Sequence, residues 1–239
     1  METKAFKRLS YGISDFRHIM LNNYAYVDKT RFIAKLEDES NPSHFFIRPR
    51  KFGKSLFFKM LYYYYNISYK DEFEQLFGSL YIGKHPTPER NSFAIMEFDF
   101  SGLDTGGEEE FRRSFSQKVQ DSVCLFLGMN GKLIPNAPQL IRKIDEKDPG
   151  VGALEIAFDA VSQCGLRIYL IVDEYDHFAN DLIAMGTIKG ESFYKTMVKA
   201  NGMVRDFYEC VKAATKSSVV YRTFITGISP VMLDDLTSG

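Results

Sequence analysis

The sequence contains no tryptophan, only three cysteines and almost no net charge. Its 239 residues carry 30 Lys and Arg against 31 Asp and Glu, and this balance argues against a nucleic-acid coat protein or a membrane-surface peptide. No run approaches the about 18 uncharged apolar residues of a membrane span, and the charged first eight residues precede no apolar stretch. We therefore expect a cytoplasmic protein with no membrane partner.

The few cysteines and histidines form no recognisable site. Cys124, Cys164 and Cys210 are odd in number, far apart and without CxxC or Cys/His spacing, which gives little support to a disulfide framework or a structural zinc site. The four histidines also lack metal-ligand spacing. We expect reduced and mostly buried thiols.

Apolar residues, by contrast, are plentiful: they make up 45% of the chain and include 21 Phe and 14 Tyr. Runs rich in β-branched and aromatic residues predict four strands, at residues 44–48, 93–100, 166–172 and 219–226. Helical patterns lie between and beside them, at residues 54–65, 108–127, 151–164 and 191–215. Strands separated by helices cannot form hairpins, so we predict a three-layer α/β domain with a mainly parallel sheet and helices on both faces.

A Gly-Lys-Ser sequence opens the first predicted helix, after an apolar strand and a short basic turn. Backbone N–H groups at a helix N-terminus bind phosphate, a lysine there reaches the β- and γ-phosphates, and the hydroxyl that follows ligates Mg²⁺. We assign these roles to a solvent-directed Lys54 and to Ser55. The residues expected to contact the nucleotide are Arg48, Pro49, Arg50, Lys51, Phe52, Gly53, Lys54, Ser55 and Leu56.

This loop is degenerate, because Arg48 stands where the full GxxxxGK[ST] pattern has its first glycine. A charged strand-to-helix turn without a ligand is the alternative interpretation. A basic loop that meets a nucleic-acid backbone is a further alternative, although the net charge of −1 makes it the lesser one.

A second motif is an apolar strand that ends in Asp173 and Glu174. An Asp at the carboxyl end of a strand beside the P-loop strand can hold Mg²⁺, and the adjacent Glu can orient and deprotonate the attacking water. Ligands of open α/β sheets bind at this edge, where both motifs are expected. The alternative is a polar strand end that caps the next helix.

Three further groups of residues have two interpretations each. Thr226 ends the last predicted strand, where it either contacts the γ-phosphate or the attacking water, or simply precedes a glycine turn. Asp99 and Ser101 close another strand, and a turn role is favoured over a site role. The four tyrosines at residues 62–65 are expected to pack between helix and sheet, with a base-stacking platform as the alternative.

Four ordered motifs resemble the bacterial and archaeal AAA-ATPase-like family: YVDKT at residues 26–30, RPRKFGKS at 48–55, DEYD at 173–176 and TGISPV at 226–231. The family's loop also lacks the first glycine. The resemblance implies a P-loop ATPase of the additional-strand class that binds ATP and Mg²⁺, with Ser55 and Asp173 as metal ligands and Glu174 and Thr226 as catalytic residues. It also implies that Tyr26 and Asp28 lie near the adenine.

Longer members of this family carry a helical lid and often a restriction-endonuclease-like domain of the PD-(D/E)xK type. The chain ends at Gly239, soon after the predicted strand at 219–226, so we expect one ATPase domain over residues 1–239 that is truncated before these parts. The resemblance also makes a homo-oligomer, and a nuclease-like domain or nucleic acid as partner, candidate associations.

The sequence thus supports three hypotheses in order. The first is an ATP-binding, Mg²⁺-dependent ATPase core whose turnover drives a conformational change. The second is a nucleotide-gated switch with little hydrolysis, which Glu174 disfavours because pure binding needs no base. The third is a nucleic-acid-binding module that uses the basic loop, whose binding would fall steeply with salt.

Overall fold

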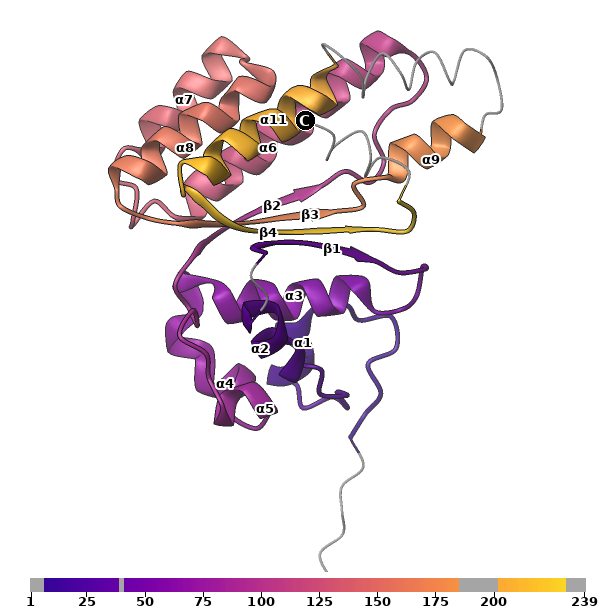
Figure 1. Ribbon diagram of the computed structural model, residues 1–239, viewed down its shortest axis with the longest axis vertical. Helices are drawn as coiled ribbons and strands as arrows, with labels where there is room; N and C mark the ends of the chain where they lie inside the picture. The colour runs from indigo at the N-terminus through magenta and orange to yellow at the C-terminus, as the bar shows by residue number, and fades with distance from the viewer. Residues whose placement is uncertain (1–6, 39–40, 185–201, 231–239) are drawn as a thin grey trace, which may run out of the picture. The chain divides into compact units, whose positions relative to one another are not determined.

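The computed structural model describes residues 7–38, 41–184 and 202–230 (Figure 1). The chain divides into two compact units. Unit 1 comprises Met1–Pro42 and Arg50–Phe93, and unit 2 comprises Ser43–Pro49 and Ala94–Gly239. Among the described residues, no helix has both the length and the apolar character needed to cross a membrane.

In the described part of unit 2, four strands form a sheet in which neighbours are parallel, in the order β1-β4-β3-β2. The strands are β1 (Ser43–Ile47), β2 (Ala94–Asp99), β3 (Ile168–Asp173) and β4 (Val220–Gly227). The predicted parallel α/β fold is confirmed, with small shifts at the strand ends. One detail is wrong, because β4 lies between β1 and β3, so the strand that ends in Asp173 is not beside the P-loop strand.

The helices that the structure describes in unit 2 are α6 (Glu108–Met129), α7 (Ala137–Lys147), α8 (Ala153–Gln163), α9 (His177–Ala184) and α11 (Met203–Lys216), with a 3₁₀ turn at Gly150–Gly152. Figure 1 shows α6, α8 and α11 along one face of the sheet. Stacked and edge-on rings fill the space between them, as in the pair Phe100 and Phe115, whose centroids are 4.9 Å apart. Of the helix predicted at 191–215, residues 191–201 lie outside the described residues and the rest forms α11.

Unit 1 is helical. It contains α1 (Phe16–Leu21), α2 (Arg31–Asp38), α3 (Lys54–Tyr65), a 3₁₀ helix (Ile67–Glu72), α4 (Phe73–Phe77) and α5 (Tyr81–Lys84). Helix α3 has the predicted bounds, and its run from Tyr62 to Tyr65 is buried. Tyr63 packs edge-on against Tyr69 at 4.8 Å, and Tyr64 packs against Phe77 at 5.4 Å. These rings therefore form a core, and the alternative interpretation, a base-stacking platform, is wrong.

The three cysteines are free thiols, as expected. Cys124 and Cys210 are half-buried, whereas Cys164 is exposed. The expectation of mostly buried thiols is therefore partly met by Cys124 and Cys210 and is wrong for Cys164. Burial raises the pKa of Cys210 to about 11, and it also raises the pKa of Cys124. Both half-buried cysteines are therefore protonated and unreactive at neutral pH.

Candidate functional site

The carboxyl edge of the unit 2 sheet brings together the acidic strand end of β3 and the hydroxyl of β4. The Thr226 hydroxyl, which is fully buried, donates a hydrogen bond to Oδ1 of Asp173. The backbone N–H of Glu174 donates to the same oxygen at 3.0 Å. Asp173 is therefore oriented from both sides, and its strand end is a fixed carboxylate, not a freely rotating one. Ile47 at the end of β1 pairs with Gly227, so the chain enters the basic loop at this same edge.

Glu174 has a strained backbone, with a φ of 51°. A left-handed conformation at a residue with a Cβ costs about 1–3 kcal/mol and is concentrated at functional sites. The side chain is 39% exposed, and its Oε2 lies 3.8 Å from Nε2 of His177. Nδ1 of His177 in turn lies 3.1 Å from Oδ2 of Asp181. Glu174 is thus accessible to a ligand at this edge while its neighbours hold the turn.

Tyr175 and Asp176 bind the segment that follows β4. Asp176, which is buried, accepts hydrogen bonds from the backbone N–H groups of Ile228 and Ser229, and the latter measures 2.6 Å. It also accepts from the Ser229 hydroxyl at 2.8 Å and from the Asn180 amide at 2.9 Å. The Tyr175 hydroxyl donates to the Ser229 carbonyl at 2.6 Å. We call these two side chains the latch, because they connect the ends of β3 and β4.

Gly227 is required by the same latch. A Cβ at this position would overlap the Tyr175 ring and the Asp176 carboxylate. The close approach of these two segments therefore links the Tyr-Asp pair of the second motif to the glycine of the fourth.

Asp176→Ala is expected to lower the free energy of unfolding by about 2–4 kcal/mol, because buried N–H and O–H donors lose a charged acceptor. Chemical denaturation measures this change. Asp181→Ala is the matched control: its carboxylate is 44% exposed and contacts His177 at the surface, so its removal should cost under about 1 kcal/mol. Equal losses in the two variants would contradict the structural role of the latch.

The turn that precedes α3 compensates for the missing first glycine. Lys51 has a φ of 66° and Gly53 a φ of 76°, so two of its residues are left-handed. Gly53 is the N-cap of α3 and provides no side-chain hydrogen bond. Gly53 therefore offers no side chain of its own to the first N–H groups of α3, and a turn with left-handed residues forms a concave nest of N–H groups suited to an anion.

The side chains of this loop differ in exposure. Arg50, Lys51, Phe52 and Ser55 are exposed, whereas Lys54 is 8% exposed. The expectation of a solvent-directed Lys54 is therefore wrong: as the first residue of a helix that is apolar almost all round, it has its aliphatic stem covered.

The loop begins in unit 2, where Arg48 and Pro49 follow β1 and are both exposed. The Arg48 N–H donates to the Gly227 carbonyl at 3.1 Å, and its guanidinium lies 5.1 Å from the centre of the Phe46 ring. Arg48 therefore prolongs the pairing of β1 with β4 at the point where the full pattern has a flexible glycine.

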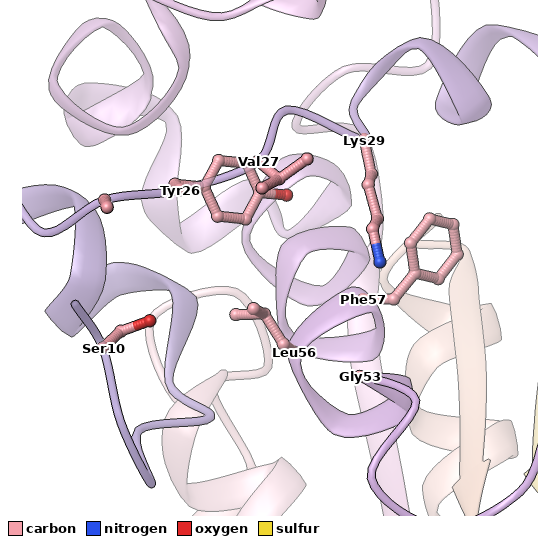
Figure 2. Close-up of a pocket in the computed structure, with 8 residues that line it drawn as sticks. Ser10, Tyr26, Val27, Lys29, Gly53, Leu56 and Phe57 are labelled. Atoms are coloured by element: carbon pink, nitrogen blue, oxygen red, sulfur yellow. The ribbon is translucent and has the colours of Figure 1, made fainter.

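Unit 1 has a pocket of about 220 Å³ beside the start of α3 (Figure 2). Its walls are largely apolar, and the lining residues are Ser10, Ala25, Tyr26, Val27, Lys29, Gly53, Leu56 and Phe57. The volume is below the about 300–1,000 Å³ of pockets for drug-sized ligands, so it suits one part of a nucleotide. Tyr26, Gly53 and Leu56 are the three sequence-predicted site residues among the described lining residues.

Tyr26 contributes its ring to the pocket, while its hydroxyl is turned into unit 1. The hydroxyl donates to the Met60 sulfur at 3.3 Å. Burial, together with the charge of Asp28, raises the pKa of Tyr26 above its usual value. Tyr26 is therefore neutral at any physiological pH and acts as an apolar wall.

Asp28 is not among the residues that line the pocket. Its Oδ1 accepts from the Thr30 N–H at 2.8 Å and from the Thr30 hydroxyl at 2.6 Å, and its Oδ2 accepts from the Tyr81 N–H at 2.7 Å. Burial acts to raise the pKa of Asp28, but these hydrogen bonds outweigh it and hold the pKa below its usual value. The side chain thus connects the start of α2 to the start of α5.

Asp28→Ala is expected to lower the free energy of unfolding by about 1–3 kcal/mol at pH 7, since two helix starts lose an acceptor. Because the folded pKa is depressed, this contribution is complete above the unfolded pKa of about 3.9 and is lost as the pH falls through the lower folded pKa. The free energies of unfolding of Asp28→Ala and of the wild type, measured at several pH values, should therefore converge at acid pH. Asp71→Ala removes an exposed aspartate of unit 1 and is the control, which should change the free energy of unfolding at pH 7 by no more than about 0.5 kcal/mol.

Comparison with protein families matches residues 10–237 to a family described as "Predicted AAA-ATPase". The chain belongs to this family. The match spans all four motifs up to Val231, so the resemblance seen in the sequence is confirmed. Neither the search of curated proteins nor the search of solved structures gave a match. For this AAA-ATPase-like chain the family supports nucleotide binding, and the parallel sheet agrees with a P-loop fold.

The motifs also contain residues to which the sequence gave no role. Lys29 lines the pocket, and Asp176 anchors the segment after β4. Both were visible as members of the YVDKT and DEYD segments, but the pattern alone does not tell which side chain faces a ligand and which one faces the protein.

Proposed function

We propose that this chain is the core of an ATP-binding, Mg²⁺-dependent ATPase that couples nucleotide binding and hydrolysis to a conformational change. The observation that supports it most is the carboxyl edge of the unit 2 sheet, where Thr226 fixes Asp173 and where the chain leaves β1 for the Gly-Lys-Ser turn. Ligand sites of open parallel sheets lie at this edge. Family membership favours the same function.

The phosphates of ATP would bind at the start of α3. The N-cap residue of α3 is a glycine, which makes no side-chain hydrogen bond, and the helix dipole favours an anion there. Lys54 follows the Gly53 cap directly, and its ammonium adds charge-assisted hydrogen bonds to phosphate oxygens. Burial of its stem restricts its rotamers, so less entropy is lost on binding.

The donor set fits Mg²⁺. Mg²⁺ prefers oxygen ligands, keeps several waters and is held by one or two carboxylates together with substrate phosphates. Asp173 provides an oriented carboxylate and Ser55 an exposed hydroxyl, and the described residues contain no group of three or more His, Cys, Asp or Glu that would suit a softer or fully caged metal. Bound Mg²⁺ neutralises charge on the β- and γ-phosphates.

Glu174 and Thr226 serve the chemical step in different ways. Glu174, with its accessible carboxylate, orients the attacking water and takes its proton. The Thr226 hydroxyl donates a hydrogen bond to Asp173, so its part is to hold that carboxylate, while its lone pairs can still accept a hydrogen bond.

The pocket beside α3 would receive the base. Tyr26, Val27 and Leu56 offer an apolar wall for a flat ring, and Val27 is 78% exposed without one. The latch offers a path for the conformational change, because Tyr175 and Asp176 directly follow Glu174 and hold the segment after β4. A shift of Glu174 on loss of the γ-phosphate would move that segment.

The experiment is calorimetric titration of the purified chain with ATP, with and without Mg²⁺, together with a phosphate-release assay. The proposal expects binding that tightens with Mg²⁺ and a measurable release of phosphate. Binding with no release would instead favour a nucleotide-gated switch. DNA binding that is independent of Mg²⁺-ATP and falls steeply with salt would favour the nucleic-acid module.

A further inference from the structure

Among the described residues that line the pocket, Lys29 is the one that carries a charge. Figure 2 shows its side chain beside Phe57, with the amine directed toward the turn at Gly53. A Cβ added at Gly53 would lie 3.9 Å from its Nζ. The amine is therefore within reach of any ligand atom that approaches the N-terminal end of α3.

The backbone on both sides of Lys29 is fixed. Asp28 accepts from the Tyr81 N–H at 2.7 Å, and the Thr30 hydroxyl accepts from the Ile82 N–H at 3.1 Å. Thr30 is fully buried, whereas Lys29 is exposed. The segment is thus attached to α5 on either side of a residue whose side chain is left for the pocket.

The Lys29 ammonium makes no hydrogen bond or ion pair with any residue that the structure describes. The described residues that line the pocket include no aspartate or glutamate, so none of them balances its charge. A cation beside the N-terminal end of a helix is an arrangement that favours an anionic ligand.

We propose that Lys29 is a second phosphate-binding lysine, which contacts the phosphate chain of a nucleoside di- or triphosphate alongside Lys54. This inference rests on the proposed function, since it places the same ligand at the start of α3. Lys29 approaches from the segment that forms the base pocket, whereas Lys54 belongs to the helix itself. The two lysines would therefore bind one nucleotide from two elements of unit 1. Together they would fix the position of the base relative to the phosphates.

The test compares Lys29→Gln, Lys29→Arg and Lys35→Gln with wild type, by titration with ATP and with ADP at low and high KCl. Lys35 is the matched control, because it is an exposed lysine of α2 that does not line the pocket. We expect Lys29→Gln to weaken ATP and ADP roughly tenfold at low salt, Lys29→Arg to retain most of the affinity, and Lys35→Gln to bind as wild type. The defect should shrink in high salt, where the lost attraction is screened.

Wild-type affinity in Lys29→Gln overturns the inference. So does a loss that is equal at both salt concentrations and is shared by Lys29→Arg, because that pattern would indicate packing against the base and not charge. The proposed function fails separately: it is overturned when the wild-type chain binds no ATP, or when Lys54→Met binds as wild type. Binding by the wild type that depends on Lys54 but not on Lys29 refutes the second lysine alone.

Discussion

Lys54→Met is expected to reduce ATP affinity by roughly 100-fold while the protein remains folded. Hydrogen bonds from a charged group contribute about 1.5–3 kcal/mol, and 1.4 kcal/mol is tenfold in affinity. Methionine matches the aliphatic stem of the buried lysine and lacks only the ammonium, so the change tests charge and not packing. Titration with ATP in the presence of Mg²⁺ measures the effect.

Two further variants make this result specific. Lys54→Ala should lose the same affinity and in addition some stability, because truncation of a buried stem leaves a cavity. Lys70→Met removes an exposed lysine from the 3₁₀ helix of unit 1 and should bind ATP as wild type. Far-UV circular dichroism and thermal unfolding check that all three variants fold. Unchanged ATP affinity in folded Lys54→Met would remove the Gly-Lys-Ser turn from the nucleotide site.

The sheet could be predicted from the sequence because its strands are continuous apolar runs. All residues from Ile168 to Val172 are buried, which is typical of a parallel strand. Such a strand is recognised by its apolar run, without an alternation of apolar and polar residues. The order of the strands could not be predicted in the same way, since nothing in the sequence of β4 tells that it pairs with both β1 and β3. Pairing is decided by long-range packing, which local pattern does not contain.

The short helices of unit 1 were also missed, for a physical reason. Helices of four to eight residues are marginal on their own and depend on tertiary contacts. Helix α1, for example, is held by Phe16, which stacks on Phe77 at 5.0 Å, and by the Asp15 carboxylate that accepts from the His18 N–H. These partners are distant in sequence or are recognisable only after the helix is known.

In the candidate site, strand ends were predictable and side-chain directions were not. Asp173 and Thr226 meet because both end parallel strands, which the apolar runs already implied. Asp28 and Lys29 are neighbours in the sequence, but their side chains have different roles. Asp28 accepts a hydrogen bond from the start of α5, whereas Lys29 lines the pocket. A single residue of register decides this in an irregular segment, where neither a period of 2 nor one of 3.6 applies.

Glu174→Gln is expected to bind Mg²⁺-ATP as wild type but to release phosphate about 10²–10⁴-fold more slowly. The amide keeps the size of the side chain and loses the base, and a positioned general base contributes a factor of this size. Binding should survive, since the proposed phosphate contacts belong to the start of α3 and the Asp173 carboxylate is still oriented by Thr226 and by the backbone N–H of residue 174. A lower kcat without weaker binding indicates an interaction made in the transition state.

The charge of Glu174 must be separated from that of its neighbours, because His177 lies between it and Asp181. Asp181→Asn removes one negative charge from this cluster and leaves Glu174 in place, so its turnover should stay within a few-fold of wild type. Single-turnover phosphate release measures all three proteins under the same conditions. If Asp181→Asn slowed release as much as Glu174→Gln, the effect would come from the net charge of the cluster. If Glu174→Gln turned over like wild type, another group would have to accept the proton of the water.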